Sequence, residues 1–458
     1  MIKNYYKNPD LPIKALAMFS ALIILAFVVR LALMPISVHS DLFFINYFPN
    51  LIYTKNVFDI FSFTHNDLSK LNVSYYPPIT FYFFGLFQYF YHFLSQSFSP
   101  WMTQIYNLRM SGVNGQSYDY LSKAPNEHIY KDIFLAKFPY LLFDLSSIYV
   151  IMIYAKKHLL RKNAILVWLF NPVILYGVYL MGQYDVIPAF FVLLSFLLIR
   201  KNVYLGIIVL GVAAAFKNFA FIFILPTILI YMKSPIERLK LAIVSFLPYF
   251  VFLCPTLIHD PTAAIFSFLP KVYLSYRKPL EDWALYSQYI KYGLFMLGYG
   301  VFLTMSFSLK SRDKWRLAVG LCLASILLFF SFAPRISFHY LLWGVPLIII
   351  WYKNSKTSFL IILIQSISLA SYKLLAIQLQ LGLFAPINLA FSVSTTFNGY
   401  VNNFFPYRII STMGYFIFLF TNLFLITQII LNLLFSEPAL VKNIEKKRER
   451  KQLIFQSS

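Results

Sequence analysis

Long apolar runs separated by short basic clusters form the dominant pattern of this chain. The first run, residues 16–36, is long enough to cross a bilayer, and Lys3, Lys7 and Lys14 precede it. Because basic residues stay on the cytoplasmic side of a membrane, the residues after 36 are expected on the outer face. Further basic clusters lie at 156–162, 200–201, 233–240, 310–316, 353–356 and 442–451. Counting the runs between them predicts about twelve transmembrane helices and two cytoplasmic termini.

The composition agrees with this pattern. Hydrophobic residues make up 59% of the 458 residues and charged residues only 12%, which excludes an ordinary soluble protein. We therefore predict an all-α polytopic membrane protein, one integral membrane domain over residues 1–458, in the cell membrane. The formal net charge of +22 lies in the short clusters between spans, where it fixes topology and contacts membrane lipids, so no nucleic-acid partner is expected.

The first outer loop is predicted to be long, from residue 37 to 132. Residues 42–54 are aromatic but interrupted by polar residues and proline, which favours an interfacial helix. The apolar run 79–94 is ambiguous. If it crossed the membrane, the cluster 156–162 would be outside; if it lies in the interface, positive charge stays inside at every later crossing, which we prefer. A second outer loop is expected at 259–291, and residues 437–458 form a basic cytoplasmic tail.

Polar residues inside the apolar runs indicate a buried site. In the predicted second span, residues 133–154, Lys137 and Asp144 lie seven apart and therefore on one helix face. Such residues face inward, either as a structural polar lock or in a catalytic role.

Lys217 interrupts the thirty-residue apolar stretch that follows the fourth span. One long helix would bury Lys217 in lipid at a cost of about 2.5 to 3.5 kcal/mol. Two short helices, 203–216 and 219–232, avoid this cost and place Lys217 at an outward-facing mouth. Broken helices at membrane depth are tolerated where they line a cavity, which favours a site there.

The predicted outer face carries a cationic pocket with a few carboxylates. Cations suit a phosphate leaving group, and an isolated carboxylate suits a general base that takes a proton from a hydroxyl. No nucleotide-binding fingerprint is present, so the pattern favours transfer from a lipid-phosphate donor outside the cytoplasm. The candidate phosphate-binding residues are Lys217, Arg277, Arg335 and His339. The candidate acceptor-binding residues are His39, Tyr76, Gln183, Tyr184 and Asp185, and the family resemblance described below implies that this group also binds a sugar.

Asp41 is the predicted general base. A phosphate is already a good leaving group, so one carboxylate near the cations is sufficient. Competing carboxylates are Asp185, Glu281 and Asp282, whereas Asp144 lies deep in its span. Blander interpretations stay open: Asp41 as a solvated loop carboxylate, Lys217 as a lysine extending to the interface, and His339 as a hydrogen-bond partner of a helix end.

Several of these residues stand in an ordered set of motifs that resembles the polytopic GT-C glycosyltransferases, more narrowly family 87 and the bacterial proteins like GPI mannosyltransferase II. The motifs lie between residues 41 and 346. They are Asp41, Tyr76-Pro77-Pro78, Lys137-Phe138-Pro139 through Asp144, Asn171-Pro172 through Gly182-Gln183-Tyr184-Asp185, Ala215-Phe216-Lys217, and Pro334-Arg335 through His339-Tyr340-Leu341-Leu342.

This resemblance implies an outer-facing active site, a polyprenyl-phosphate-linked sugar donor, and an inverting displacement with the first-loop aspartate as base. The hexose would be mannose, and the acceptor a lipid or a glycan. The chain departs from the family because Asp41 stands between Ser40 and Leu42, without the paired acidic motif of several members. We expect no cofactor, and a divalent metal requirement is left open. The insertion 95–131 matches no family motif.

Two other classes of function fit the same residues. A transporter or flippase for an anionic lipid-linked substrate would line its path with the same cations, although the sequence lacks the inverted repeat of many transporters. A non-catalytic scaffold would tolerate the loss of Asp41.

Overall fold

The computed structural model is helical wherever it describes the chain, and it contains no strand in those residues. It describes residues 13–60, 62–63, 76–113, 117–156, 164–262, 282–309, 311, 313–333, 336–352, 354–373, 381–389, 391 and 407–456. The first half contains α2 (Ile13–Ile36), α3 (Ser40–Lys55), α5 (Pro78–Leu94), α6 (Phe98–Met110), α7 (Ser117–Lys123), α8 (Ile129–Lys156), α9 (Ala164–Leu169), the π-helix η1 (Ile174–Leu180) and α10 (Val186–Ile199). The second half contains α11 (Val203–Phe216), η2 (Asn218–Ala220), α12 (Phe221–Tyr231), α13 (Pro235–His259), α15 (Asp282–Ser308), α16 (Lys314–Phe332), η3 (Phe338–Trp343), α17 (Val345–Trp351), α18 (Ser355–Lys373), η4 (Leu381–Phe384) and α21 (Tyr407–Gln456).

Among the described residues, six helices are long and apolar enough to cross a membrane: α2, α8, α13, α15, α16 and α21. The helical fold and the presence of helices that can span a membrane are therefore as predicted. The count of about twelve crossings is not confirmed. Several predicted spans are short helices, such as α10 and α11 with 14 residues each. At about 1.5 Å per residue such a helix is shorter than the roughly 30 Å hydrocarbon layer.

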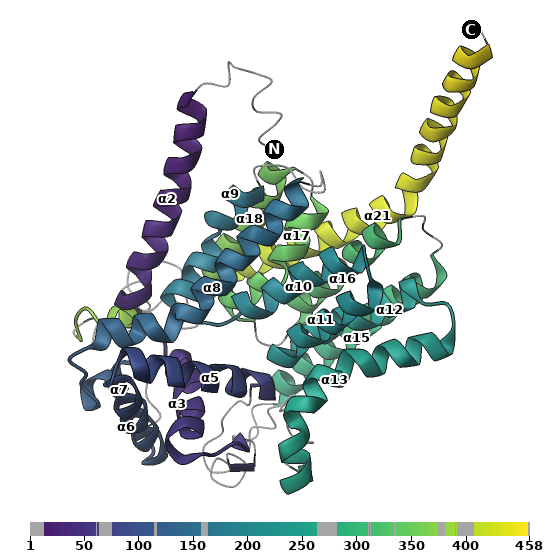
Figure 1. The fold of residues 1–458 in the computed structure, drawn as a ribbon. Helices are drawn as coiled ribbons and strands as arrows, with labels where there is room; N and C mark the ends of the chain where they lie inside the picture. Colours follow the sequence, from purple (N-terminus) through teal and green to yellow (C-terminus); the bar gives the residue numbers. More distant parts are fainter. Residues whose placement is uncertain are drawn as a thin grey trace.

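The predicted first outer loop folds into the helices α3, α5, α6 and α7, which lie at one end of the molecule (Figure 1). The stretches 42–54 and 79–94 are helical, within α3 and α5. The α5 helix runs across the direction of α2 in Figure 1. Leu86 and Phe93 on α5 are exposed. This orientation is typical of an interfacial helix, although its place in a membrane stays a prediction.

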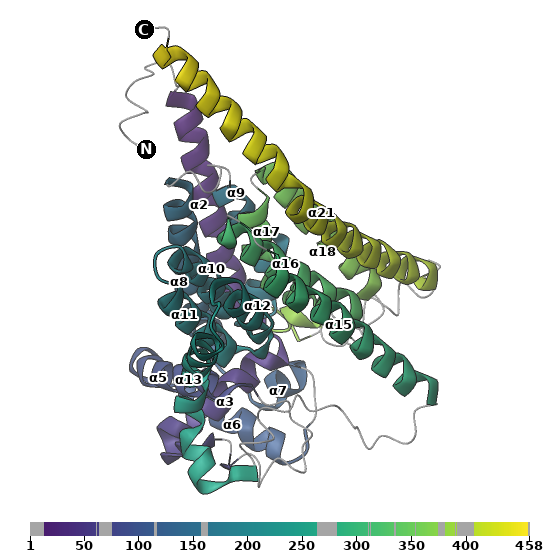
Figure 2. The same cartoon turned by 90° about the vertical axis from the view of Figure 1, so that its right-hand side faces the viewer.

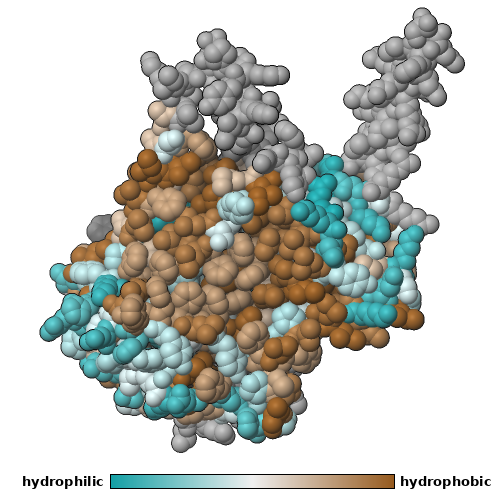
Figure 3. Space-filling view, viewed as in Figure 1, coloured by the Kyte–Doolittle hydropathy of each residue, from teal (hydrophilic) through white to brown (hydrophobic). Residues whose placement is uncertain are grey.

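The start of α2 and the end of α21 lie at the opposite end of the molecule from α3 (Figure 1, Figure 2). Figure 3 shows a broad apolar face between these ends, with hydrophilic residues below it over the end that holds α3 to α7. The predicted basic tail extends α21 as a helix to Gln456. Most of the predicted second outer loop, from 263 to 281, lies outside the described residues.

Asp144 forms a buried polar lock between α2, α8 and the segment around η1. Its carboxylate accepts hydrogen bonds from Arg30 Nε at 2.7 Å, Trp168 Nε1 at 2.6 Å and Tyr179 Oη at 2.6 Å. Arg30 Nη1 also donates to the Leu169 carbonyl at 2.8 Å. Arg30 and Asp144 are fully buried. Of the two interpretations of Asp144, the structure favours the structural one, because its oxygens are already occupied by these donors.

The helix break at Lys217 was predicted correctly. The α11 helix begins after Asn202, whose side chain accepts from the Leu205 amide, and it ends at Phe216. The Phe216 carbonyl, which has no intrahelical partner at a helix end, accepts from Tyr184 Oη at 2.9 Å and Thr80 Oγ1 at 3.1 Å. Two hydroxyls from elsewhere in the chain thus stabilise the open end of α11.

Arg30→Met should strongly destabilise the fold, because it leaves the Asp144 carboxylate buried without a countercharge. We expect a loss of about 3 to 5 kcal/mol. The double variant Arg30→Met/Asp144→Asn removes both charges and keeps an acceptor oxygen, so it should recover most of the loss. Thermal unfolding of the purified variants in one detergent measures both effects. A double variant no more stable than the single one would show that charge pairing does not hold these helices.

Candidate functional site

The predicted site residues that the structure describes come together where α3, the segment after η1, the α11–α12 break and η3 meet. Two carboxylates organise them. Asp41 contacts His39 and Gln183, and Asp185 contacts Lys217 and His339. Tyr76 and Tyr184 lie beside Lys217. Arg277 and Arg335 lie outside the described residues, as does Glu281, and the structure does not describe the side chain of Asp282.

Asp41 stands in the first turn of α3, where the helix dipole favours a negative charge. His39 caps this helix, and its Nδ1 accepts the backbone N–H of Asp41 at 3.2 Å. The same nitrogen lies 3.4 Å from Asp41 Oδ2, to which Gln183 Nε2 also donates a hydrogen bond. The Asp41 side chain is 37% exposed and that of His39 31%. Asp41 is therefore oriented by its neighbours and still accessible.

The charges and hydrogen bonds around Asp41 keep it ionised. Burial alone would raise its pKa, but His39, His339 and the hydrogen bond from Gln183 outweigh burial and hold that pKa well below its usual range. Burial lowers the pKa of His39, yet the neighbouring Asp41 raises it above its usual value. A neutral His39 caps α3, and a protonated one pairs with the Asp41 carboxylate.

Gly182 brings Gln183 to Asp41 by adopting a left-handed backbone with φ of +73°. A Cβ at this position would lie 3.2 Å from the side chain of Leu42 and 3.2 Å from Lys137 Cε. The next residue, Gln183, donates its backbone N–H to the Gly177 carbonyl in η1 at 3.0 Å. Glycine is favoured here, because the left-handed backbone conformation strains other residues and an added Cβ would press on its neighbours.

Asp185 is fully buried and already engaged. Lys217 Nζ donates to both of its oxygens at 2.8 and 2.9 Å, and Trp343 Nε1 donates to Oδ1. His339 Nε2 lies 4.0 Å from Oδ2. These partners make Asp185 an anchor for Lys217 and leave it poorly placed to take a proton from a substrate.

Aromatic rings surround the ammonium group of Lys217, and the Lys217 side chain is only 12% exposed. The distances from its Nζ to the ring centroids are 4.8 Å for Tyr184, 5.5 Å for Trp343, 5.6 Å for Tyr340 and 6.0 Å for Tyr76. Cations are attracted to ring faces at such distances.

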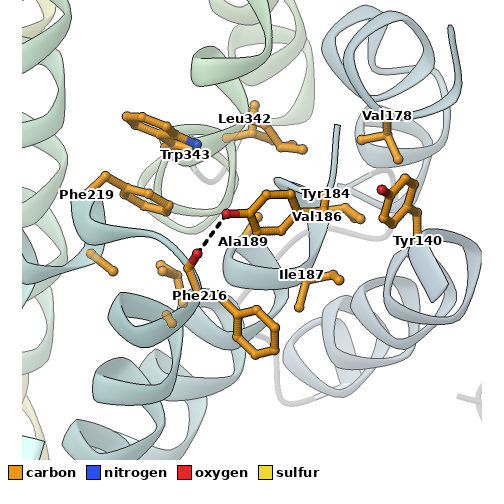
Figure 4. Close-up of a cluster of buried hydrophobic side chains, with 14 of the residues drawn as sticks. Tyr140, Val178, Tyr184, Val186, Ile187, Ala189, Phe216, Phe219, Leu342 and Trp343 are labelled. Carbon is orange, nitrogen blue, oxygen red and sulfur yellow. Dashed lines mark hydrogen bonds between the residues drawn. The ribbon is translucent and has the colours of Figure 1, made fainter. Parts of the chain in front are cut away.

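Stacked rings continue this aromatic group. Trp343 stacks on Tyr340 at 4.2 Å between centroids and on Phe219 at 4.4 Å. Figure 4 shows Phe219 beside Trp343, and the Tyr184 hydroxyl directed at the Phe216 carbonyl. The rings and the carboxylate together fix the position of the Lys217 ammonium.

Two buried polar atoms of the site have no hydrogen-bond partner among the described residues: Gln183 Oε1 and His339 Nδ1. Gln183 is 1% exposed and His339 6% exposed. Buried polar atoms are nearly always paired in native proteins, so these two are candidates for contacts with a bound ligand.

Trp343, Tyr340 and Arg30 have structural roles that were not predicted from the sequence. Trp343 follows His339 by one turn, and a buried indole needs an acceptor for its N–H, which is the signal that could have found it. Arg30 is a cation inside an apolar run and requires a partner there. Asp144 was the available carboxylate.

No family model and no curated protein matches this chain. The resemblance to GT-C glycosyltransferases therefore stays a prediction from the motifs. Within the described ranges, no group of three or more His, Cys, Asp or Glu side chains is arranged to hold a metal ion.

Gly182→Ala should disturb the site as well as the fold. A non-glycine residue in the left-handed conformation costs about 1 to 2 kcal/mol, and the added Cβ presses on Leu42 and Lys137. Gly112→Ala is a matched control, because Gly112 has φ of +92° and no atom within 4 Å of the added Cβ. Both variants should unfold at lower temperature in detergent, and only Gly182→Ala should weaken binding of a polyprenyl-phosphate sugar. Equal binding by the two variants would contradict this assignment.

Proposed function

We propose that this protein is an inverting glycosyltransferase. It would move a hexose, mannose by the resemblance, from a polyprenyl-phosphate carrier to a lipid- or glycan-linked acceptor on the extracytoplasmic face. The observation that supports this most strongly is the contrast between the two carboxylates of the site. Asp41 is oriented, ionised and accessible, whereas Asp185 is buried under Lys217 and Trp343.

In the proposed reaction the acceptor hydroxyl attacks the anomeric carbon from the face opposite the phosphate. A new C–O bond forms, the bond from the anomeric carbon to the phosphate oxygen breaks, and its electron pair leaves with the phosphate. The hydroxyl proton goes to Asp41 as the new bond forms. A single displacement inverts the configuration, and the phosphate needs no strong general acid to leave.

The surroundings of Asp41 support sugar binding in this proposal. Gln183 uses its amide nitrogen on Asp41, which leaves Oε1 to accept from a sugar hydroxyl. His339 Nδ1 is a second buried atom available to a hydroxyl. The ring of Tyr340, which stacks on the buried Trp343, supplies an apolar group beside them.

Lys217, Arg277, Arg335 and His339 are the proposed phosphate ligands. For Lys217 this role has a consequence, because its ammonium is already bonded to both oxygens of Asp185. An ammonium has three N–H donors, so a donor phosphate would share Lys217 with Asp185 and not replace it outright.

The flippase alternative would place the same cations along a path through the protein. Lys137 is the next buried cation near the site, and it is fully buried among oxygen acceptors of the chain itself. This burial disfavours a path past Lys137. A transfer assay separates the enzyme from a flippase and from a scaffold, because only the enzyme forms a new glycosidic bond.

Asp41→Asn keeps the shape of the side chain and removes the proton acceptor. We expect the rate to fall by about 10² to 10⁴ with little change in donor binding. The measurement uses membranes that contain the protein and a radiolabelled polyprenyl-phosphate sugar. Asp185→Asn serves as the comparison. Near-normal turnover in Asp41→Asn together with none in Asp185→Asn would show that Asp41 is not the general base.

Lys217→Met should weaken donor binding, but it also leaves Asp185 as a buried unpaired charge. The double variant Lys217→Met/Asp185→Asn removes both charges at nearly constant volume and should restore the fold. If Lys217 binds the phosphate, both variants bind the donor more weakly than Asp185→Asn alone. Donor affinity in the double variant equal to that of Asp185→Asn would remove Lys217 from the phosphate site. Binding is measured by titration of the purified proteins with the donor.

A further inference from the structure

Lys137 is a fully buried cation that the proposed reaction does not use. Its Nζ donates to the Ser37 carbonyl at 2.6 Å, the Tyr179 carbonyl at 2.6 Å and Ser37 Oγ at 3.1 Å. In the described part of the chain it forms no ion pair. Its three N–H donors thus meet three uncharged oxygens, and no carboxylate compensates its charge.

The acceptors of Lys137 belong to the two segments that carry the Asp41–Gln183 pair. Ser37 follows the end of α2 and stands four residues before Asp41, and Tyr179 in η1 stands four residues before Gln183. Ser37 Oγ also lies 3.2 Å from the Tyr179 carbonyl, to which it donates. One ammonium therefore joins the two segments just before they reach the hydrogen bond between Asp41 and Gln183.

The stem of Lys137 also supports the turn before Gln183. Its Cε lies 3.2 Å from the position that a Cβ on Gly182 would take, so the turn packs directly on the lysine. Burying an ammonium among neutral acceptors is expensive, and an apolar side chain of similar volume would avoid that cost. A geometric role explains why the position holds a lysine.

We propose that Lys137 is a positioning residue that keeps Gln183 within hydrogen-bond distance of Asp41. This proposal rests on the proposed function. Lys137 touches neither substrate nor the reacting atoms. It fixes the distance between the end of α2 and the end of η1. Without it the two segments separate, Gln183 loses its hold on the Asp41 carboxylate, and the base is displaced from the acceptor hydroxyl.

Loss of the contacts made by Lys137 should change the pH dependence of the rate. The hydrogen bond from Gln183 is one of the interactions that lower the pKa of Asp41, together with His39 and His339. Losing that bond, the smallest of these contributions, raises the pKa of Asp41 by a small amount while His39 and His339 still lower it. Since the base acts in its ionised form, the acidic limb of the rate profile then moves to higher pH.

The test compares Lys137→Met with Tyr154→Phe in the full-length protein. Tyr154 lies on the same helix and also donates to a backbone carbonyl of another helix, that of Leu193 at 3.2 Å, but far along α8 from the site. Lys137→Met should lower kcat by about 10- to 100-fold with little change in the KM for the donor, and shift the acidic limb to higher pH. Tyr154→Phe should do neither.

Hydrogen–deuterium exchange supplies a readout that does not depend on activity. Lys137→Met should raise exchange in the peptides covering 38–48 and 177–186 more than elsewhere, and Tyr154→Phe should not. If Lys137→Met fails to fold, Ser37→Ala carries the test, because it removes one acceptor and keeps the ammonium on both carbonyls. It should shift exchange and rate in the same direction by a smaller factor.

Wild-type kcat and pH profile in Lys137→Met would overturn the proposal, as would a rise in exchange spread evenly over the chain. A wild-type protein without transfer activity would instead reject the proposed function. In that case the exchange comparison still decides whether Lys137 clamps the two segments.

Discussion

The architecture depends on the partners of three charged residues buried among the apolar helices. Asp144 is held by Arg30 between α2 and α8. Asp185 is held by Lys217. Lys137 is held by carbonyl and hydroxyl oxygens alone. Because an unpaired buried charge costs several kcal/mol, each of these contacts fixes the helices that carry its members. The site is built between these fixed points.

Interrupted helices also shape the site, because they expose polar backbone groups inside the helical bundle. The chain leaves helical geometry between α9 and η1, after η1 at Gly182, and between α11 and α12 at Lys217. The second and third interruptions each bring a side chain of the site into place: Gln183 after Gly182, and Lys217 after Phe216. The exposed carbonyl of Phe216 is satisfied by hydroxyls of other segments, so the break is stable without water or lipid at that atom.

Elementary energetics predicted the parts of this fold that local cost determines. A lysine in the middle of an apolar stretch had to sit at a break, and α11 and α12 are separated at Lys217. A carboxylate soon after the first apolar run had to lie just beyond the end of α2, and Asp41 lies there in the first turn of α3. Both follow from the chain alone, because no distant residue is needed to make the alternative expensive.

The partners of the buried charged side chains could not be predicted in the same way, because they depend on which segments of the chain meet in the fold. Nothing in the sequence distinguishes Asp185 from a phosphate as the partner of Lys217, or a carbonyl from a carboxylate as the partner of Lys137. The predicted number of crossings is not confirmed, for a related reason. A run of fourteen apolar residues looks alike whether it spans a bilayer or ends half-way through the protein.

The hydroxyl of Thr80 connects the α5 helix to the site. Thr80 belongs to α5, a helix with an apolar outer face, and it shares the Phe216 carbonyl with Tyr184. A displacement of α5 against the bundle would stretch a hydrogen bond one residue away from Lys217. If α5 rests in the lipid interface, the thickness and lateral pressure of the bilayer become part of the mechanical support of the site. Activity would then depend on the lipid composition around the protein, even where no lipid contacts a reacting group.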